Sequence, residues 1–305
     1  MILGTLAAEH VRHQLNANGI ALRVGRFNAL IQSDISQVSQ DIMTVYADAE
    51  VLEHAPIDFH IQLLGSGGFR RVFRPQVNFY FHGHAPFLPL PIEQSLPLME
   101  WGLNWCVSQH YHRTLVVHAA VVEKYGKALI LPGQPGAGKS TLCASLVASG
   151  GFRLLSDELT LIELESGNIL PNPRPISLKN KAIDIIRPTR GQLNLSRVVH
   201  DTQKGSVGLL QPPAQSVAAW NCPASPGLVV FPRFNAQAEG GKLQALDKGH
   251  ALMQMANQCF NYSVLAEQGF KALANHLEQA RTFSFEYDGN LEAAIDLMDE
   301  MLHES

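Results

Sequence analysis

The chain has 305 residues, of which 46% are hydrophobic and 16% charged, and its formal net charge is -4. This length allows one large domain or two modest ones with a sizeable core, and the composition argues against a disordered chain. The chain is slightly acidic and lacks the excess of lysine and arginine with which proteins bind nucleic acid, so we expect no nucleic-acid partner.

The spacing of the cysteines and the residue types at the N-terminus indicate the cellular compartment. The cysteines are far apart and form no C-x-x-C pair, which argues against a disulfide framework or a structural zinc site and fits a reducing cytosol. The first residues show no basic start followed by an apolar stretch, and the chain has no run of about 18 apolar residues. We therefore predict a cytoplasmic protein without a signal peptide or a membrane partner. The cysteines are Cys106, Cys143, Cys222 and Cys259.

The first ninety residues are predicted to form a small, mostly β domain of the α+β class. Strands are expected where apolar and polar residues alternate, and the run Gly65–Gly68 indicates a hairpin turn. Residues 38–46 fit a helix or a strand. The expected elements are a helix over Thr5–Ala17, strands over Ile20–Val24, Phe27–Ser33, Phe59–Leu64, Arg70–Phe73 and Val77–Phe81, and the ambiguous segment Val38–Tyr46.

A proline-rich stretch, Ala85–Pro91, is the predicted linker, because each proline removes a backbone donor from a ladder. Apolar residues near helical spacing then predict a helix over Ile92–Tyr111. We expect the domain boundary here, with residues 1–90 in the first domain and residues 91–305 in the second.

The second domain is predicted to be α/β. Its pattern is strand, turn, strand, glycine-rich loop, helix and strand, followed by short β segments and then by helices. The expected elements are strands over Leu115–Val122, Lys127–Leu131, Phe152–Leu155, Thr160–Glu165, Val207–Leu210 and Gly227–Phe231, a turn at Tyr125-Gly126, and helices over Thr141–Ser149, Gly249–Ala256, Glu267–Gln279 and Leu291–His303.

The glycine-rich loop matches the phosphate-binding pattern G-x-x-x-x-G-K-[ST] at every fixed position. Glycines let backbone N–H groups turn toward phosphate oxygens, and the helix that follows adds the positive end of its dipole. Lys139 would place a charge on the β- and γ-phosphates, and the Ser140 hydroxyl would ligate Mg²⁺. The strand before the loop and the helix after it agree with this reading, so we predict an ATP and Mg²⁺ site. Its residues are Gly133, Gln134, Pro135, Gly136, Ala137, Gly138, Lys139, Ser140 and Thr141.

An acidic pair, Asp157-Glu158, follows the loop lysine after a short interval and comes directly after a predicted strand. One helix and a turn are expected to bring that strand back beside the strand that enters the loop, so that the pair lies next to the phosphates. An acid there can hold hydrated magnesium or accept a proton from an attacking hydroxyl. Two adjacent acids allow both roles, and the residues alone do not assign them.

From His118 through the loop to Asp157-Glu158, the chain resembles the catalytic domain of HPr kinase/phosphorylase. The order is a histidine, a Tyr-Gly turn, the phosphate loop and an acidic pair, over roughly residues 115–235. The chain is most similar to the A-type group of HPr kinase-related proteins. Four segments carry that resemblance, namely Glu100–Trp105, His118–Ala120, Pro175–Asn180 and Val230–Arg233.

The resemblance implies a P-loop kinase core of the type shared by HPr kinase and phosphoenolpyruvate carboxykinase. By position, Asp157 would act as the base on the acceptor hydroxyl, Glu158 would help hold the metal, and His118 would lie near the metal and phosphates. It also implies a homo-oligomer by analogy. Glu158 stands where the family has a second Asp, Ala119 where it has Gly, and Thr141 where it usually has Glu. These departures weaken the implication that HPr itself is the substrate or that a reverse phosphorylase reaction exists.

Other residues are candidates on weaker grounds. Arg233 follows an apolar strand and would neutralise charge on the transferred phosphoryl group, or is a solvated strand-end arginine. Lys204, Lys179 and Arg174 lie in polar or proline-rich segments from which they would reach the acceptor or the phosphates, or remain surface charges. Without the resemblance, the apolar run around His118 indicates a core histidine. A metal interpretation of the remaining histidines, such as His82, His84, His110 and His112, lacks a completing cluster.

Three functions remain open from the sequence. The favoured one is an ATP-dependent kinase that transfers the γ-phosphoryl group to a hydroxyl, most simply a serine of a protein or peptide. The second is a kinase for a small-molecule acceptor. The third is a non-enzymatic ATP-binding module that controls assembly with a partner. The identity of the acceptor is not encoded in any pattern of residues that we recognise.

Overall fold

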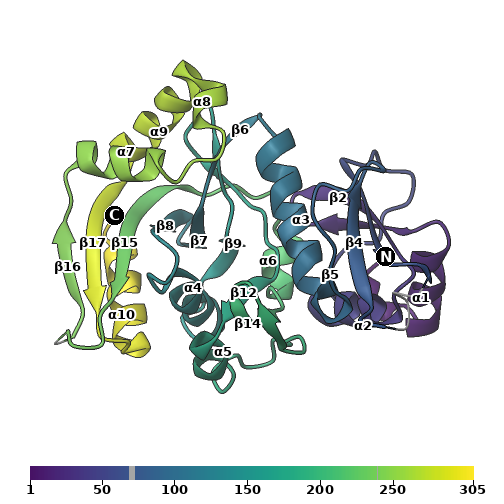
Figure 1. Cartoon of the computed structure of the whole chain (residues 1–305). Coiled ribbons are helices and arrows are strands. Elements are labelled where there is room, and N and C mark those ends of the chain that lie inside the picture. Colours follow the sequence, from purple (N-terminus) through teal and green to yellow (C-terminus); the bar gives the residue numbers. More distant parts are fainter. Residues whose placement is uncertain (69–72, 239) are drawn as a thin grey trace.

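The computed structural model describes residues 1–68, 73–238 and 240–305 and shows a mixed α/β fold (Figure 1). These residues form four sheets. A five-stranded sheet belongs to the N-terminal part of the chain, and a six-stranded sheet forms the centre of the remainder. Two three-stranded sheets complete the strand pairing.

The N-terminal sheet has the order β1-β2-β3-β4-β5. Every second residue of β1 and β2 is buried, because alternating apolar side chains all point to one face of a strand. That face forms one hydrophobic core with the neighbouring helices. The elements are η1 (Leu3–Thr5), α1 (Ala8–Asn16), β1 (Ile20–Val24), β2 (Phe27–Ser33), α2 (Ser36–Val45), β3 (Phe59–Gly65), β4 (Gln76–Phe81), β5 (Leu90–Pro91), η3 (Ile92–Gln94) and α3 (Ser95–His110).

Strands β1 and β2 have the bounds that the alternation predicts. The ambiguous segment Val38–Tyr46 lies in α2, where Val38, Ile42 and Val45 are buried at helical spacing. The predicted helix over Thr5–Ala17 begins only at Ala8, because the backbone before it is extended. The strand predicted over Arg70–Phe73 lies largely outside the described residues.

The expectation that Ala85–Pro91 takes no part in a ladder is wrong at its end. Leu90 and Pro91 form β5, which pairs with β4 at the edge of the sheet. An edge strand tolerates proline, because the missing donor can face away from its partner. The domain boundary at residues 90 and 91 stays a prediction. The helix that follows it, α3, packs Met99 and Leu103 into the same core as the N-terminal sheet.

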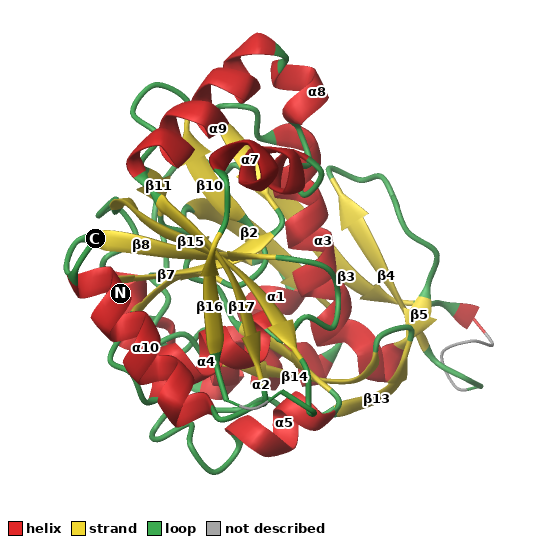
Figure 2. Ribbon diagram, turned by 90° about the vertical axis from the view of Figure 1, so that its left-hand side faces the viewer, coloured by secondary structure: helices red, strands yellow, loops and turns green. Residues whose placement is uncertain are grey.

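The central sheet has the order β16-β17-β15-β8-β7-β9. Strands β8, β15 and β17 are parallel, whereas β7 is antiparallel to both β8 and β9. One core joins the sheet to α4 and α10, and another joins it to α7 and α9 (Figure 2). The elements are β7 (Ala119–Lys124), β8 (Lys127–Pro132), α4 (Lys139–Ala148), β9 (Arg153–Ser156), β15 (Ser225–Phe234), β16 (Lys242–Ala245), α7 (Lys248–Ala256), α8 (Tyr262–Leu265), α9 (Glu267–Gln279), β17 (Arg281–Tyr287) and α10 (Leu291–His303).

The two smaller sheets have the orders β11-β10-β6 and β12-β14-β13. Their strands are short and antiparallel, and their connections are interrupted by proline and glycine. The elements are β6 (Thr114–Val117), β10 (Thr160–Glu163), β11 (Ile169–Leu170), β12 (Ile176–Lys179), α5 (Lys181–Ile186), β13 (Val199–Thr202), β14 (Gly205–Leu210) and α6 (Ala214–Ala218).

Two strand predictions in this region are wrong. The single strand expected over Leu115–Val122 is broken at His118, whose backbone N–H donates to Gln258 instead of to a ladder. Its halves, β6 and β7, therefore enter different sheets. Strand β9 does not lie beside β8, because the hairpin between β7 and β8 places β7 between them.

The topology brings several chain segments to one edge of the central sheet. Strands β8, β15 and β17 run in the same direction, and β9 shares it because both β8 and β9 are antiparallel to β7. Their carboxyl ends therefore meet at the edge where β7 begins. The phosphate loop, the acidic pair, the end of β15 and His118 all lie at this edge.

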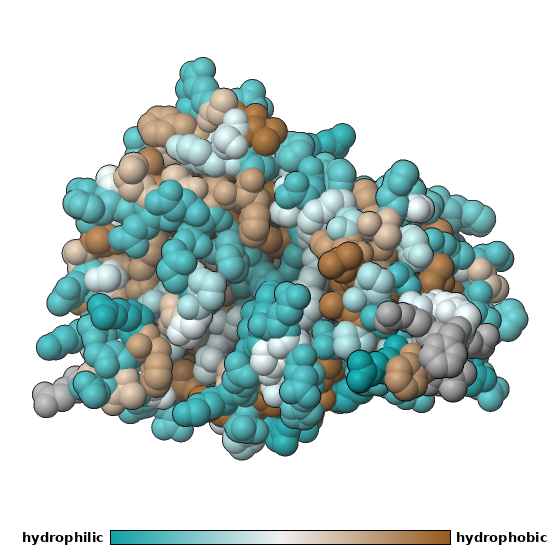
Figure 3. Space-filling model, viewed as in Figure 1, coloured by the Kyte–Doolittle hydropathy of each residue, from teal (hydrophilic) through white to brown (hydrophobic). Residues whose placement is uncertain are grey.

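Figure 3 shows apolar residues over α8 and α9 and a second apolar group over the N-terminal part near β4 and β5, whereas most of the rest of this face is hydrophilic. Val264, on α8, is 64% exposed, and Phe260, two residues before this helix, is 45% exposed. None of the helices in the described ranges combines the length and apolar character needed to cross a bilayer.

Candidate active site at the phosphate loop

The glycine-rich loop joins β8 to α4, as its sequence predicts. Gly136 and Gly138 have φ angles of 87° and 91°, in the left-handed region that favours glycine. Lys139 is buried, and its ammonium donates to the carbonyl oxygens of Gly133 at 2.6 Å and Gln134 at 3.2 Å. The lysine charge thus lies inside the curve of the loop, where a bound phosphate would compete for it.

Tyr287, at the end of β17, lies directly against the loop. A Cβ atom added to Gly138 would be only 2.3 Å from the Tyr287 hydroxyl oxygen. The Tyr287 ring is stacked on Phe285, with 5.2 Å between centroids, so it has little room to retreat. Gly138 therefore meets two requirements, a left-handed backbone and the absence of a side chain.

Asp157 follows β9 and is connected to the loop through Ser140. Its Oδ2 atom accepts a hydrogen bond from the Ser140 hydroxyl at 3.2 Å and from the Ser177 backbone N–H at 2.9 Å. Its Oδ1 atom is buried and has no hydrogen-bond partner in the described part of the chain. Burial, and next the charge of Glu158, raise the pKa of Asp157 to about 6.

The raised pKa predicts a pH-dependent stability of the nucleotide-free protein. The folded state holds the Asp157 proton more tightly than the unfolded chain does, so this carboxyl favours folding below about pH 4, and the advantage is lost as the pH rises through 6. The Asp157→Asn variant does not ionise and should be more stable than the wild type at pH 8, by up to about 3 kcal/mol. Urea unfolding in chelator should show this difference shrinking at pH 5. A variant less stable than the wild type at pH 8 would contradict the raised pKa.

The surroundings of Glu158 shift its pKa in the direction opposite to that of Asp157. Its carboxylate accepts from the Asn104 side-chain amide and pairs with the Lys179 ammonium at 3.2 Å. Burial alone would raise the pKa of Glu158, but the charges of Lys179 and Lys204 outweigh it and hold the pKa below its usual value. The adjacent acids therefore differ, with Glu158 the permanently ionised one.

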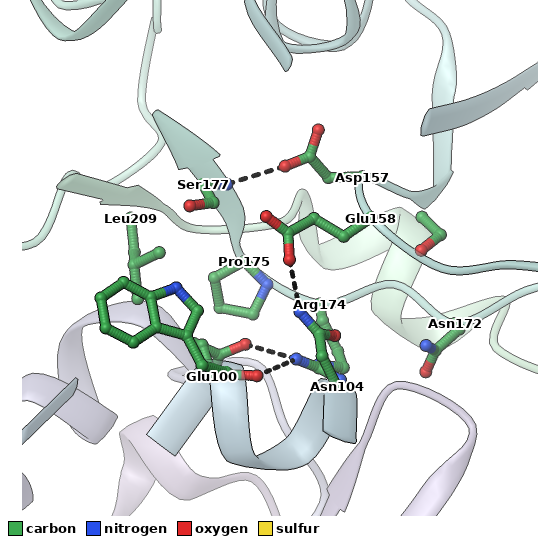
Figure 4. A pocket seen from close by; sticks show the side chains of 11 residues that line it. Glu100, Asn104, Asp157, Glu158, Asn172, Arg174, Pro175, Ser177 and Leu209 are labelled. Atoms are coloured by element: carbon green, nitrogen blue, oxygen red, sulfur yellow. Dashed lines mark hydrogen bonds and ion pairs between the residues drawn. The ribbon is translucent and has the colours of Figure 1, made fainter. Parts of the chain in front are cut away.

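Helix α3 supplies one wall of the site (Figure 4). Asn104 reaches Glu158, and the Lys204 ammonium lies 5.1 Å from the centroid of the Trp101 ring. A small hollow lies between this helix and the acidic pair. Trp101, Asn104, Pro175 and Ser177 are among the residues that line it.

Arg174 lies under this hollow and not among the loop residues. It is buried, and its guanidinium donates to the Glu100 carboxylate at 2.8 Å and to the Glu100 carbonyl at 3.1 Å. Tyr46 donates to the other Glu100 oxygen at 2.5 Å. This network ties the segment that leads to Ser177, the backbone donor to Asp157, to helices of the N-terminal part.

His118 and Arg233 lie at the same edge but differ in environment. His118 is half-buried, and its ring lies 5.8 Å from that of Phe260. Burial, and next the charge of Lys139, lower the pKa of His118, so it is neutral near pH 7. Arg233 is exposed near the end of β15, opposite Glu286 of β17.

The histidines at the end of α3, on β3 and just after β4 are grouped with aromatic rings. His110 stacks on Phe81 at 4.8 Å and contacts Trp105 at 5.2 Å. His60 and His82 lie 5.3 Å apart. Within the described ranges there is no group of three or more histidine, cysteine, aspartate or glutamate side chains placed to hold a metal ion.

Sequence reasoning gave no role to three residues of the site. Asn104 lies 54 positions before Glu158, and no local sequence pattern predicts the hydrogen bond between them. The contribution of Ser177 is a backbone N–H, which no residue type reveals. Tyr287 had a detectable signal, because Phe283, Phe285 and Tyr287 alternate as in a strand, yet β17 was not predicted.

No protein-family model matches this chain, and no curated protein matches it in sequence.

Proposed function

We propose that this chain is an ATP-dependent kinase with a P-loop kinase core like that of HPr kinase and phosphoenolpyruvate carboxykinase. The observation that carries the proposal is the contact between the loop hydroxyl of Ser140 and the buried carboxylate of Asp157. Phosphoryl transfer to a hydroxyl needs a group that orients the nucleophile beside the phosphates, and the unpartnered Oδ1 atom of Asp157 is available for this role.

The residues present fit ATP and Mg²⁺. Lys139 and the loop backbone offer a cradle in which no side chain stands at Gly136 or Gly138. The unpartnered Asp157 Oδ1 atom and the ionised Glu158 carboxylate offer oxygens for water, metal or acceptor. Mg²⁺, when bound with ATP, would neutralise phosphate charge, and Ser140 and Glu158 would hold it.

The two acids differ in their contacts, and this difference divides the work between them. Asp157 has a buried, unpartnered Oδ1 atom and is suited to accept the proton of an acceptor hydroxyl. Glu158 stays ionised beside Lys179 and is suited to hold hydrated metal. Arg233 and His118, at the same edge, would contact the phosphates from the two sides of the loop.

The acceptor is a hydroxyl, and two classes are compatible with the site. A serine of a protein or peptide is the first. A hydroxyl of a small molecule that contacts the hollow beside α3 is the second. The test is phosphate transfer from γ-labelled ATP with Mg²⁺ to a metabolite panel and to proteins encoded by adjacent genes, with the product located by mass spectrometry.

A nucleotide-controlled assembly module makes a different prediction. It would bind ATP and change its association with a partner, and Asp157→Asn would leave that control intact while no acceptor became labelled. That pair of results would overturn the kinase proposal.

A further inference from the structure

Phe234 is a large aromatic side chain at the edge that carries the phosphate loop. It is the last residue of β15 and is 50% exposed. Its ring meets Tyr287 edge-on, with 5.9 Å between centroids and 69° between planes. An exposed ring costs free energy in water, so a ring held beside a ligand loop is a candidate contact for an apolar part of that ligand.

The direction of a bound nucleotide follows from the order of strands, given the proposed function. The acidic pair lies on the β9 side of the loop, so the terminal phosphate and its metal belong on that side. The rest of an extended nucleotide then runs the opposite way, toward the carboxyl ends of β15 and β17. Phe234 and Tyr287 are the last residues of these two strands and are direct neighbours in the register.

Strand alternation places Phe234 on the same side of the sheet as the helix that follows the loop. Leu228 and Val230 of β15 belong to the core shared with α4, and Phe234 has the same parity. Arg233 has the opposite parity and points to the other side. Tyr287 connects Phe234 to the loop. Its ring contacts that of Phe234, and its hydroxyl lies where a side chain at position 138 would be.

The turn after β17 leaves room for the ring. Gly289 has a φ of 100°, and a Cβ atom there would lie 3.1 Å from the Phe234 ring. The turn is fixed by Asp288, whose carboxylate accepts from the Asn290 N–H at 2.9 Å, and by Asn290, which caps α10. A side chain at position 289 would crowd the ring, and glycine leaves that space free.

We propose that Phe234, supported by Tyr287 and Gly289, is the stacking face for the purine base of the donor nucleotide. Base-on-aromatic stacking accepts any base, since every base has a π face. The site would thus raise affinity for a nucleoside triphosphate over a triphosphate without a base. The inference rests on the proposed ATP site and adds the position of the base.

The test compares ligands with and without a base. Isothermal titration calorimetry with Mg²⁺ would measure binding of ATP, GTP and inorganic tripolyphosphate to the wild type and to Phe234→Ala. The wild type should bind ATP more tightly than tripolyphosphate. Phe234→Ala should weaken ATP about tenfold or more and leave tripolyphosphate unchanged. Phe234→Trp should retain ATP affinity, and the ratio of ATP to GTP affinity identifies the preferred purine.

A matched control separates stacking from a general loss of aromatic surface. Phe270, on α9, is 49% exposed, and Phe270→Ala should leave both ligands unaffected. Equal weakening of ATP and tripolyphosphate in Phe234→Ala, or equal affinities for the two in the wild type, would overturn the stacking proposal while leaving the ATP site intact. If the wild type bound neither ligand, the proposal of an ATP site would itself be refuted.

Discussion

Replacing Gly138 by alanine should weaken binding of Mg²⁺-ATP by at least about 100-fold. The new Cβ atom would lie 2.3 Å from the Tyr287 hydroxyl oxygen, far inside van der Waals contact, on a backbone with a φ of 91°. The loop must shift to relieve this, and its N–H groups then lose their alignment on the phosphates. Calorimetric titration with ATP measures the loss, and thermal unfolding shows whether the variant still folds.

Two companion variants test whether the collision is the cause. Gly136 has a similar φ of 87°, but no described residue lies within 4 Å of the place of its Cβ atom, so Gly136→Ala should lose much less affinity. Adding Tyr287→Phe to Gly138→Ala removes the hydroxyl and leaves the ring carbon at 3.3 Å, so it should restore part of the binding. Equal losses at positions 136 and 138, with no recovery in the double variant, would show that backbone strain alone is responsible.

The phosphate loop and its flanking elements could be predicted because their signal is local. Eight consecutive residues specify the turn, and the strand and helix on either side follow from short apolar patterns. Strands β1 and β2 were predicted to the residue for the same reason, since alternation over five to seven positions shows which face is buried.

The environment of the acidic pair could not be predicted, because tertiary packing supplies it. Asp157-Glu158 was recognisable as a pair, but two of its donors come from α3 and from the backbone of Ser177. The pairing of β9 with β7 depends on a hairpin that occupies the place expected for β9. The sequence left Arg174 either a residue that reaches the phosphates or the acceptor or a surface charge, whereas the structure buries it and pairs it with Glu100.

Asp157→Asn should reduce turnover strongly. Asparagine keeps the size of the side chain and can still accept from Ser140 and Ser177, so the site should stay in place. It does not take a proton from the acceptor hydroxyl, and loss of a positioned general base costs about 10²- to 10⁴-fold in rate. Phosphate transfer should fall by this factor, while affinity for Mg²⁺-ATP stays within a few-fold of the wild type.

The neighbouring acid provides the control, because the proposal gives it a different role. Glu158→Gln should raise the Mg²⁺ concentration needed for half-maximal transfer, since an ionised ligand is lost, whereas Asp157→Asn should leave that requirement unchanged. Transfer rates measured across a Mg²⁺ titration for both variants distinguish the roles. The reverse pattern, in which Asp157→Asn alone shifts the Mg²⁺ requirement, would make Asp157 the metal ligand. Its contact with Ser140 would then be a metal-site contact, and the base would have to be sought at Glu158.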